Sequence, residues 1–221
     1  MTRFTLTTTL LSVALSAACS NSDIPTAPST LNLTDPSSAT GTASANATSA
    51  SGGSRLFAPV RQATAPYHDV STAVAAGYLA PHAAECVASP AGVMGVHAVN
   101  PALVIDQTID PLRPEALLYL PKHGGGFRLV GVEYVQAVLV RHKVTGVVSP
   151  WFAPTPWPTA EYDVVTPRPT VFGQAFDGPM PGHEPGMPWH FDLHVWAWAP
   201  NPAGDFAQFN PRLGCAGEAH D

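Results

Sequence analysis

The feature that most constrains this fold is an apolar run at positions 127–140. It reads FRLVGVEYVQAVLV and follows three consecutive glycines at 124–126. A run that is apolar on both strand faces is typical of a strand inside a sheet covered on two sides. The run therefore predicts a long central strand, and Glu133 stands inside it as its single carboxylic acid.

Around this run the pattern predicts short strands, a helix and proline-rich connections. Thr64 is placed to cap a helix, Pro66 lies near its first turn, and apolar residues recur at helical spacing up to Tyr78. Further strands are predicted at 94–99, 116–120 and 170–176, with loops at 151–158 and 179–188, where prolines gather. We therefore expect an α+β fold, a mainly antiparallel β-sheet domain with one or two helices and long Pro-rich loops.

The first 54 residues predict export and a tether. Residues 1–18 have the pattern of a signal peptide, with a short basic start, a weakly hydrophobic stretch and small residues before Cys19. The residues just before Cys19 also resemble a bacterial lipobox whose Leu15 lies one position early. Residues 20–54 contain too few large apolar side chains to fold. We expect residues 19–54 to be a lipid anchor and disordered tether, and residues 55–221 to be a single globular domain.

Cysteine number and charge bear on the compartment and the partners. If Cys19 carries a lipid, Cys86 and Cys215 remain as an even pair that an oxidising compartment would join. We expect a membrane-anchored lipoprotein that resides in the periplasm or on the cell surface. The alternative is a secreted protein. The net charge is -6 and only two of the ten basic residues are lysines, so no basic patch is available for nucleic acid.

The segment WHFDLHVWAWA at 189–199 carries the most chemical information. Its first residues alternate strictly, which favours a strand with one face toward a core. The other face would then present five side chains: His190, Asp192, His194, Trp196 and Trp198. Imidazole and carboxylate groups can bind a metal, and the indoles could form apolar walls. On a strand the two histidines are about 13 Å apart and cannot easily share one ion. A helix would bring them together, but the segment lacks the central glutamate of zinc-protease helices.

Other residues must therefore complete such a site, and three places can supply them. Glu133 is a carboxylate that needs a cation, hydrogen bonds or a proton to remain in an apolar strand. His97 lies in the apolar stretch at 94–99, and the loop GHEPGMP at 182–188 supplies His183 and Glu184. Imidazole with carboxylate suits zinc, and an added methionine would favour copper. We expect a divalent metal ion with ligands drawn from His97, Glu133, His183, His190 and His194.

Each candidate also has a simpler interpretation. His97 could be a hydrogen-bonded core residue, and Glu133 could pair with an arginine. Trp196 and Trp198 could serve only as core or rim packing. The three polar groups at 190, 192 and 194 could merely close a hydrogen-bond network. These alternatives remain open at the level of the sequence.

Several segments between Cys86 and Cys215 have distinctive sequence motifs. MGVHAVNP at 94–101, VGVEY at 130–134, GHEPGM at 182–187 and WHFDLHVWAW at 189–198 together resemble a group of exported bacterial proteins of unassigned function. The resemblance implies export and one compact domain. It supplies no activity, cofactor or catalytic residue to carry over.

Two classes of function follow from these residues. The first is a metal-dependent enzyme that activates water or oxygen at a His/Glu site on a β-sheet. The second is a non-catalytic binding protein for a metal ion or a small apolar ligand. Nucleophile chemistry is not indicated, because the sequence contains neither Gly-x-Ser-x-Gly nor Cys-x-x-Cys. Substrate and oligomeric state are not specified by the sequence.

Overall fold

A computed structural model of the chain describes residues 55–152, 157, 160–182 and 186–215. The predicted signal peptide, Cys19 and the tether lie outside these residues. Within the described ranges, three short α-helices occur: α1 (Ala58–Thr64), α2 (Val70–Ala75) and α3 (Pro101–Ile105). Three 3-10 helices accompany them: η1 (Arg55–Phe57), η2 (Ala65–His68) and η3 (Ala83–Glu85). In this part of the chain, none of the helices has the length and apolarity needed to cross a membrane.

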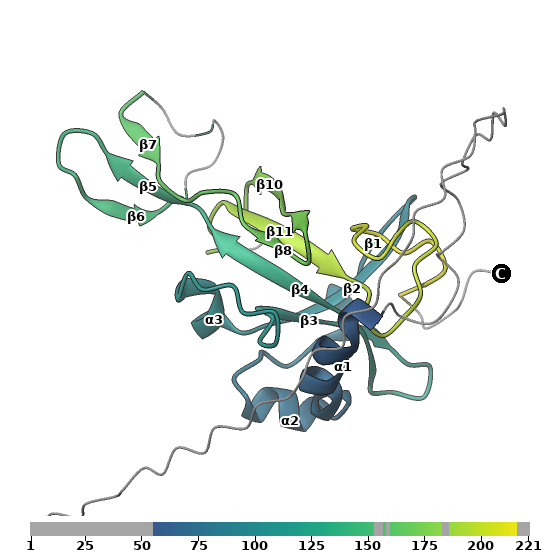
Figure 1. Ribbon diagram of the computed structural model, residues 1–221. Coiled ribbons are helices and arrows are strands. Elements are labelled where there is room, and N and C mark those ends of the chain that lie inside the picture. The colour runs from purple at the N-terminus through teal and green to yellow at the C-terminus, as the bar shows by residue number, and fades with distance from the viewer. Residues whose placement is uncertain (1–54, 153–156, 158–159, 183–185, 216–221) are drawn as a thin grey trace, which may run out of the picture. The chain divides into compact units, whose positions relative to one another are not determined.

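The strands form three sheets in which all pairings between named strands are antiparallel (Figure 1). The largest has six strands in the order β1 (Val87–Ser89), β2 (Gly92–Val99), β3 (Ala116–Pro121), β4 (Phe127–Ala137), β11 (His190–Val195) and β10 (Asp177–Met180). A three-stranded sheet has the order β6 (Val148–Pro150), β5 (Leu139–His142) and β7 (Tyr162–Val164). The third is a hairpin of β8 (Thr170–Val171) and β9 (Gln174–Ala175). The predicted α+β class with a mainly antiparallel sheet is confirmed.

Strand β4 is the centre of the six-stranded sheet, as its apolar sequence predicts, and both of its faces are covered. Side chains of one face join α1 and α2 in a helix-side core that includes Val60, Val132 and Leu193. Side chains of the other face join a smaller disulfide-side core, which comprises Val93, Leu118, Leu120, Val130, Trp196, Ala199 and Leu213. Cys86 and Cys215 pack against this second core. The rest of that second face holds the polar residues described below.

The expected single strand at 127–140 is divided between two sheets. β4 ends at Ala137, β5 begins at Leu139, and Val138 between them is fully buried. The backbone N–H of Val138 donates to the carbonyl of Trp189, while the N–H of Trp151 donates to the carbonyl of Val138. The chain thus passes from the large sheet into an arm formed by β5, β6 and β7, which extends away from the six-stranded sheet (Figure 1).

Two other local predictions need correction. The helix expected from Thr64 onward is interrupted: Thr64 ends α1, and Asp69 is extended and caps α2 by accepting from the N–H of Ser71 at 2.9 Å. The strand expected at 170–176 is the β8–β9 hairpin, because Phe172 and Gly173 both have positive φ and turn the chain. Polar capping and turn geometry outweigh apolar spacing at both places.

The described C-terminal residues are fastened to the edge region of the large sheet. Asn210 and Val93 exchange backbone hydrogen bonds of 2.9 and 3.1 Å, and Cys86 is joined to Cys215 by the predicted disulfide. Gly92 makes this approach feasible: it has φ +125°, and a Cβ there would lie 2.4 Å from the carbonyl oxygen of Asn210. The disulfide is compatible with an oxidising compartment outside the cytoplasm.

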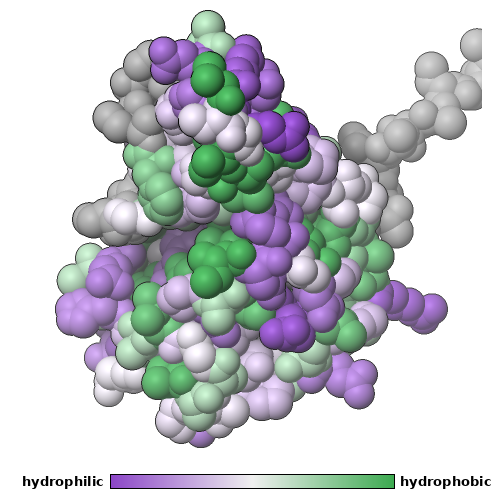
Figure 2. All heavy atoms as spheres, turned by 90° about the vertical axis from the view of Figure 1, so that its left-hand side faces the viewer, coloured by the Kyte–Doolittle hydropathy of each residue, from purple (hydrophilic) through white to green (hydrophobic). Residues whose placement is uncertain are grey.

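Large apolar side chains are also exposed at the turn of the arm. Val144 and Val147, between β5 and β6, are 89% and 61% exposed. Figure 2, which views the molecule from the left-hand side of Figure 1, shows hydrophobic and hydrophilic residues interspersed over that face. Exposed apolar residues scattered in this way are normal for a protein surface.

Candidate metal centre

Three strands bring His97, Glu133 and His194 to one face of the six-stranded sheet. In the register of β4 and β11, His194 lies directly opposite Glu133. His97 comes from β2, which is separated from β4 by β3. Glu133 is paired on its other side with Ala116 of β3, and His97 is paired with Leu118 of the same strand. Strand register therefore determines the cluster.

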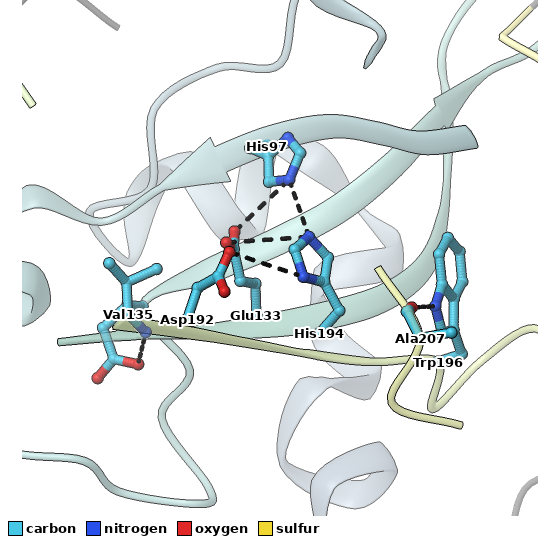
Figure 3. A network of polar contacts seen from close by, with 8 residues as sticks. His97, Glu133, Val135, Asp192, His194, Trp196 and Ala207 are labelled. Atoms are coloured by element: carbon cyan, nitrogen blue, oxygen red, sulfur yellow. Dashed lines mark hydrogen bonds and ion pairs between the residues drawn. The ribbon is translucent and has the colours of Figure 1, made fainter. Parts of the chain in front are cut away.

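The donor atoms of these three residues converge (Figure 3). His97 Nε2 lies 3.5 Å from His194 Nε2 and 3.5 Å from Glu133 Oε2. His194 Nε2 lies 3.9 Å from Glu133 Oε1. One ligand atom from each of the three residues lies within 4.8 Å of the others, which is close enough for all three to bind one metal ion. Among the described residues, no other group of three histidine, cysteine or acidic side chains meets this criterion. The sequence predicts that His97, Glu133 and His194 meet on the sheet together with His190 or His183, and this is confirmed for the first three residues.

Asp192 is the fourth polar group at this centre. It lies on β11 two residues before His194, and its Oδ2 is 3.9 Å from His194 Nδ1 (Figure 3). The carboxyl groups of Asp192 and Glu133 also influence each other's protonation. The imidazole of His194 therefore faces Asp192 with one nitrogen and the other two members of the cluster with the other.

The electrostatics of the centre follow from its burial. Desolvation, the nearby charge of Asp192 and their shared hydrogen bond raise the pKa of Glu133 well above its usual value. Burial and the charge of Asp177 raise the pKa of Asp192 to about 6, although its hydrogen bond with Glu133 acts in the opposite direction. Burial thus opposes the ionised form of Glu133. A cation would be the natural compensation for ionising it in this position.

Access to the cluster is uneven. The side chain of His97 is 15% exposed, whereas those of Glu133 and His194 are 5% and 1% exposed. A solvent molecule or small ligand would therefore approach the cluster from the side of His97. The two remaining donors are held within the protein.

The other predicted site residues have different positions. His190 is fully buried on the same strand, but its Nδ1 donates to the carbonyl oxygen of Pro188 at 3.1 Å, and it is not part of the convergent group. The strand spacing that separates it from His194 explains why. His183 and Glu184 lie outside the described residues.

The two tryptophans do not line the cluster as a pair. Trp196 follows the end of β11, packs in the disulfide-side core and donates its Nε1–H to the carbonyl of Ala207. Trp198 packs against the helix-side core and donates to Thr64 Oγ1 at 3.0 Å. The expectation that Trp198 shares a face with His194 is therefore wrong, because strand alternation ends at Val195. The packing alternative holds for both residues.

Sequence reasoning missed a third buried carboxyl group, Glu115, besides Glu133 and Asp192. It is 1% exposed, just before β3, and its Oε2 accepts a hydrogen bond of 3.1 Å from the backbone N–H of Val135. Because β3 begins only at Ala116, the Glu115 side chain supplies an acceptor for β4 one residue before β3 starts. Burial raises the pKa of Glu115 to about 8. It lies between Pro114 and the strand predicted at 116–120, and no sequence signal marks it.

Comparisons with protein-family models, with curated proteins and with solved structures find no match to this chain.

Proposed function

We propose that His97, Glu133 and His194 bind one zinc ion and that the protein is a metal-dependent enzyme. The observation that supports this most directly is the convergence of the three side chains: one ligand atom from each lies within 4.8 Å of the others, and His97 Nε2 is 3.5 Å from both His194 Nε2 and Glu133 Oε2. They come from strands far apart in the sequence, so local chain geometry does not account for the convergence. Two imidazoles and one carboxylate form a known donor set for catalytic zinc.

The separations from His97 Nε2 are compatible with a shared tetrahedral ion. Ligands about 2.1 Å from a common ion are about 3.4 Å apart in a tetrahedron and about 3.0 Å apart in an octahedron. Direct N–H···O hydrogen bonds would be about 2.7 to 3.2 Å long. The two separations of 3.5 Å from His97 Nε2 are close to the tetrahedral value, and the 3.9 Å separation is to the other carboxylate oxygen of Glu133. These separations support a shared ion.

The number of ligands bears on whether the centre is catalytic. Three protein donors from the described residues leave one tetrahedral position, and His97 lies on the accessible side of the cluster. Zinc in such a site supplies Lewis acidity and makes a bound water more acidic. A non-catalytic metal-binding protein is the second candidate, favoured by the deep burial of Glu133 and His194.

Metal content of the purified full chain tests the site itself. We expect one equivalent of zinc in the wild-type protein and loss of that zinc in the His97→Ala and Glu133→Gln variants. His123→Ala removes an exposed imidazole in a turn and serves as the matched control. Wild-type protein that takes up no zinc, or variants that retain the wild-type affinity, would contradict the proposal.

Cobalt(II) substitution separates the two candidate functions. The visible spectrum of cobalt depends on its coordination, so a small anion such as azide changes it only if an exchangeable position exists. We expect a spectral change for this protein. A cobalt spectrum insensitive to azide would favour the closed binding site over the enzyme.

We also propose that the chain is exported and anchored to a membrane through a lipid on Cys19. The supporting features are the hydrophobic start of the chain, the small residues before Cys19 and the low-complexity segment after it. The disulfide between Cys86 and Cys215 agrees with an oxidising location.

A further inference from the structure

We infer that Asp192 is a positioning residue: it orients His194 so that the Nε2 of this imidazole, and not its Nδ1, binds the metal. The inference rests on the proposed metal site and assigns a role to a residue that is not itself a ligand. Carboxylates behind metal-binding histidines fix the ring orientation and its tautomer, and their loss weakens metal binding about 10- to 100-fold.

The geometry of β11 places the two side chains correctly for this role. Asp192 and His194 are two residues apart on a strand, so both point to the same face of the sheet. Asp192 Oδ2 is 3.9 Å from His194 Nδ1, while His194 Nε2 is directed at His97 and Glu133 (Figure 3). The two ring nitrogens therefore face two different chemical groups.

This arrangement selects one tautomer. A metal ion needs an unprotonated nitrogen, and a carboxylate needs a hydrogen-bond donor. Both needs are met when His194 carries its proton on Nδ1 and presents the lone pair of Nε2 to the ion. At 3.9 Å the two atoms are farther apart than in a hydrogen bond, so the inferred role requires the Asp192 carboxyl and the imidazole to move closer when the ion binds.

Asp192 is also in contact with a second ligand of the site. Its carboxyl group also influences the protonation of Glu133, so it interacts with two of the three ligands. Asp192 is 3% exposed, and its Oδ1 has no hydrogen-bond partner among the described residues. A buried carboxyl placed between two ligands is costly unless it serves them.

The test compares Asp192→Asn with Asp177→Asn by competition for zinc with a chromophoric chelator. Asparagine keeps the shape of the side chain, but it carries no charge and has an NH2 group in place of one carboxylate oxygen. Asp177 is the exposed cross-strand partner of Asp192 on β10, so its variant removes a neighbouring charge without touching a ligand. We expect zinc affinity to fall about 10- to 100-fold in the first variant and to remain unchanged in the second.

A spectroscopic readout on the wild-type chain makes the inference independent of any variant. In zinc-loaded, 15N-labelled protein, we expect the Nδ1 of His194 to carry a proton and the Nε2 to have the shift of a metal-bound nitrogen. An Asp192→Asn variant with wild-type zinc affinity, or a His194 bound through Nδ1, would overturn the inference alone. Absence of zinc binding by the wild-type chain would overturn the proposed metal site as well.

Discussion

Replacing Glu115 by glutamine should abolish a specific part of the pH dependence of stability. The carboxyl of Glu115 is buried, and its pKa is raised from 4.5 to about 8. Between these two values the folded chain keeps a proton on Glu115 that the unfolded chain releases. Unfolding therefore releases a proton in this window, and the free energy of unfolding must fall as the pH rises.

The size of the effect follows from the shift. One unit of pKa difference corresponds to about 1.4 kcal/mol, so the contribution of Glu115 should fall by about 3 to 4 kcal/mol between pH 5 and pH 8. The stabilising contribution is complete below pH 4.5 and lost by the time the pH passes about 8. Glutamine resembles the protonated acid: its oxygen can still accept from the N–H of Val135, and it does not titrate.

Urea denaturation of the wild-type and Glu115→Gln chains at pH 5, 6, 7 and 8, with a chelator present, measures this contribution. We expect the difference in free energy of unfolding to shift progressively in favour of the variant as the pH rises. Glu161→Gln, at an exposed glutamate beside the arm, controls for the loss of one negative charge. Parallel pH profiles for wild type and Glu115→Gln would show that Glu115 is not held protonated.

Three further results are expected. Replacing both Cys86 and Cys215 by alanine should lower the free energy of unfolding by about 4 to 5 kcal/mol, since the disulfide closes a loop with a sequence separation of 129 residues. Two reactive thiols from Cys86 and Cys215 in the unreduced, denatured wild-type chain would refute this pairing. Cys19→Ala should release the protein from membranes or block its processing, and a wild-type chain wholly in the soluble fraction with an unmodified Cys19 would contradict the anchor. Zinc at 100 times its dissociation constant should stabilise the wild-type chain by about 2.7 kcal/mol and raise its melting temperature, and His194→Ala should lose this dependence; equal zinc-induced shifts in both would argue against His194 as a ligand.

The main features of the sheet could be predicted because they depend on local patterns. The apolar run containing Glu133 does form the central strand, and alternation correctly placed Asp192 and His194 on one face. The break at Val138 could not be predicted, since the residues on both sides of it are equally apolar. Hydropathy alone does not distinguish one strand from two consecutive strands in different sheets.

The choice of ligands required information that the sequence does not contain. Glu133 is opposite His194, and a shift of β11 by four residues relative to β4 would place His190 there instead. Register between distant strands depends on the loops and packing of the whole domain. The prediction for Trp198 was wrong for a related reason: the alternating sequence pattern continues beyond Val195, where the strand ends. There the backbone N–H of Trp196 donates to the carbonyl of Asp205, which lies in a loop and not in a neighbouring strand.

The origin of His97, Glu133 and His194 on three separate strands has a consequence for when the protein could acquire metal. Short spacings such as those of zinc fingers allow a partly folded chain to chelate an ion, but here the donors meet only after β2, β3, β4 and β11 have paired. An unfolded chain crossing a membrane would therefore carry no ion at this site. The metal would be taken up after folding, from the compartment in which the domain resides, and its supply there would determine which ion the centre holds.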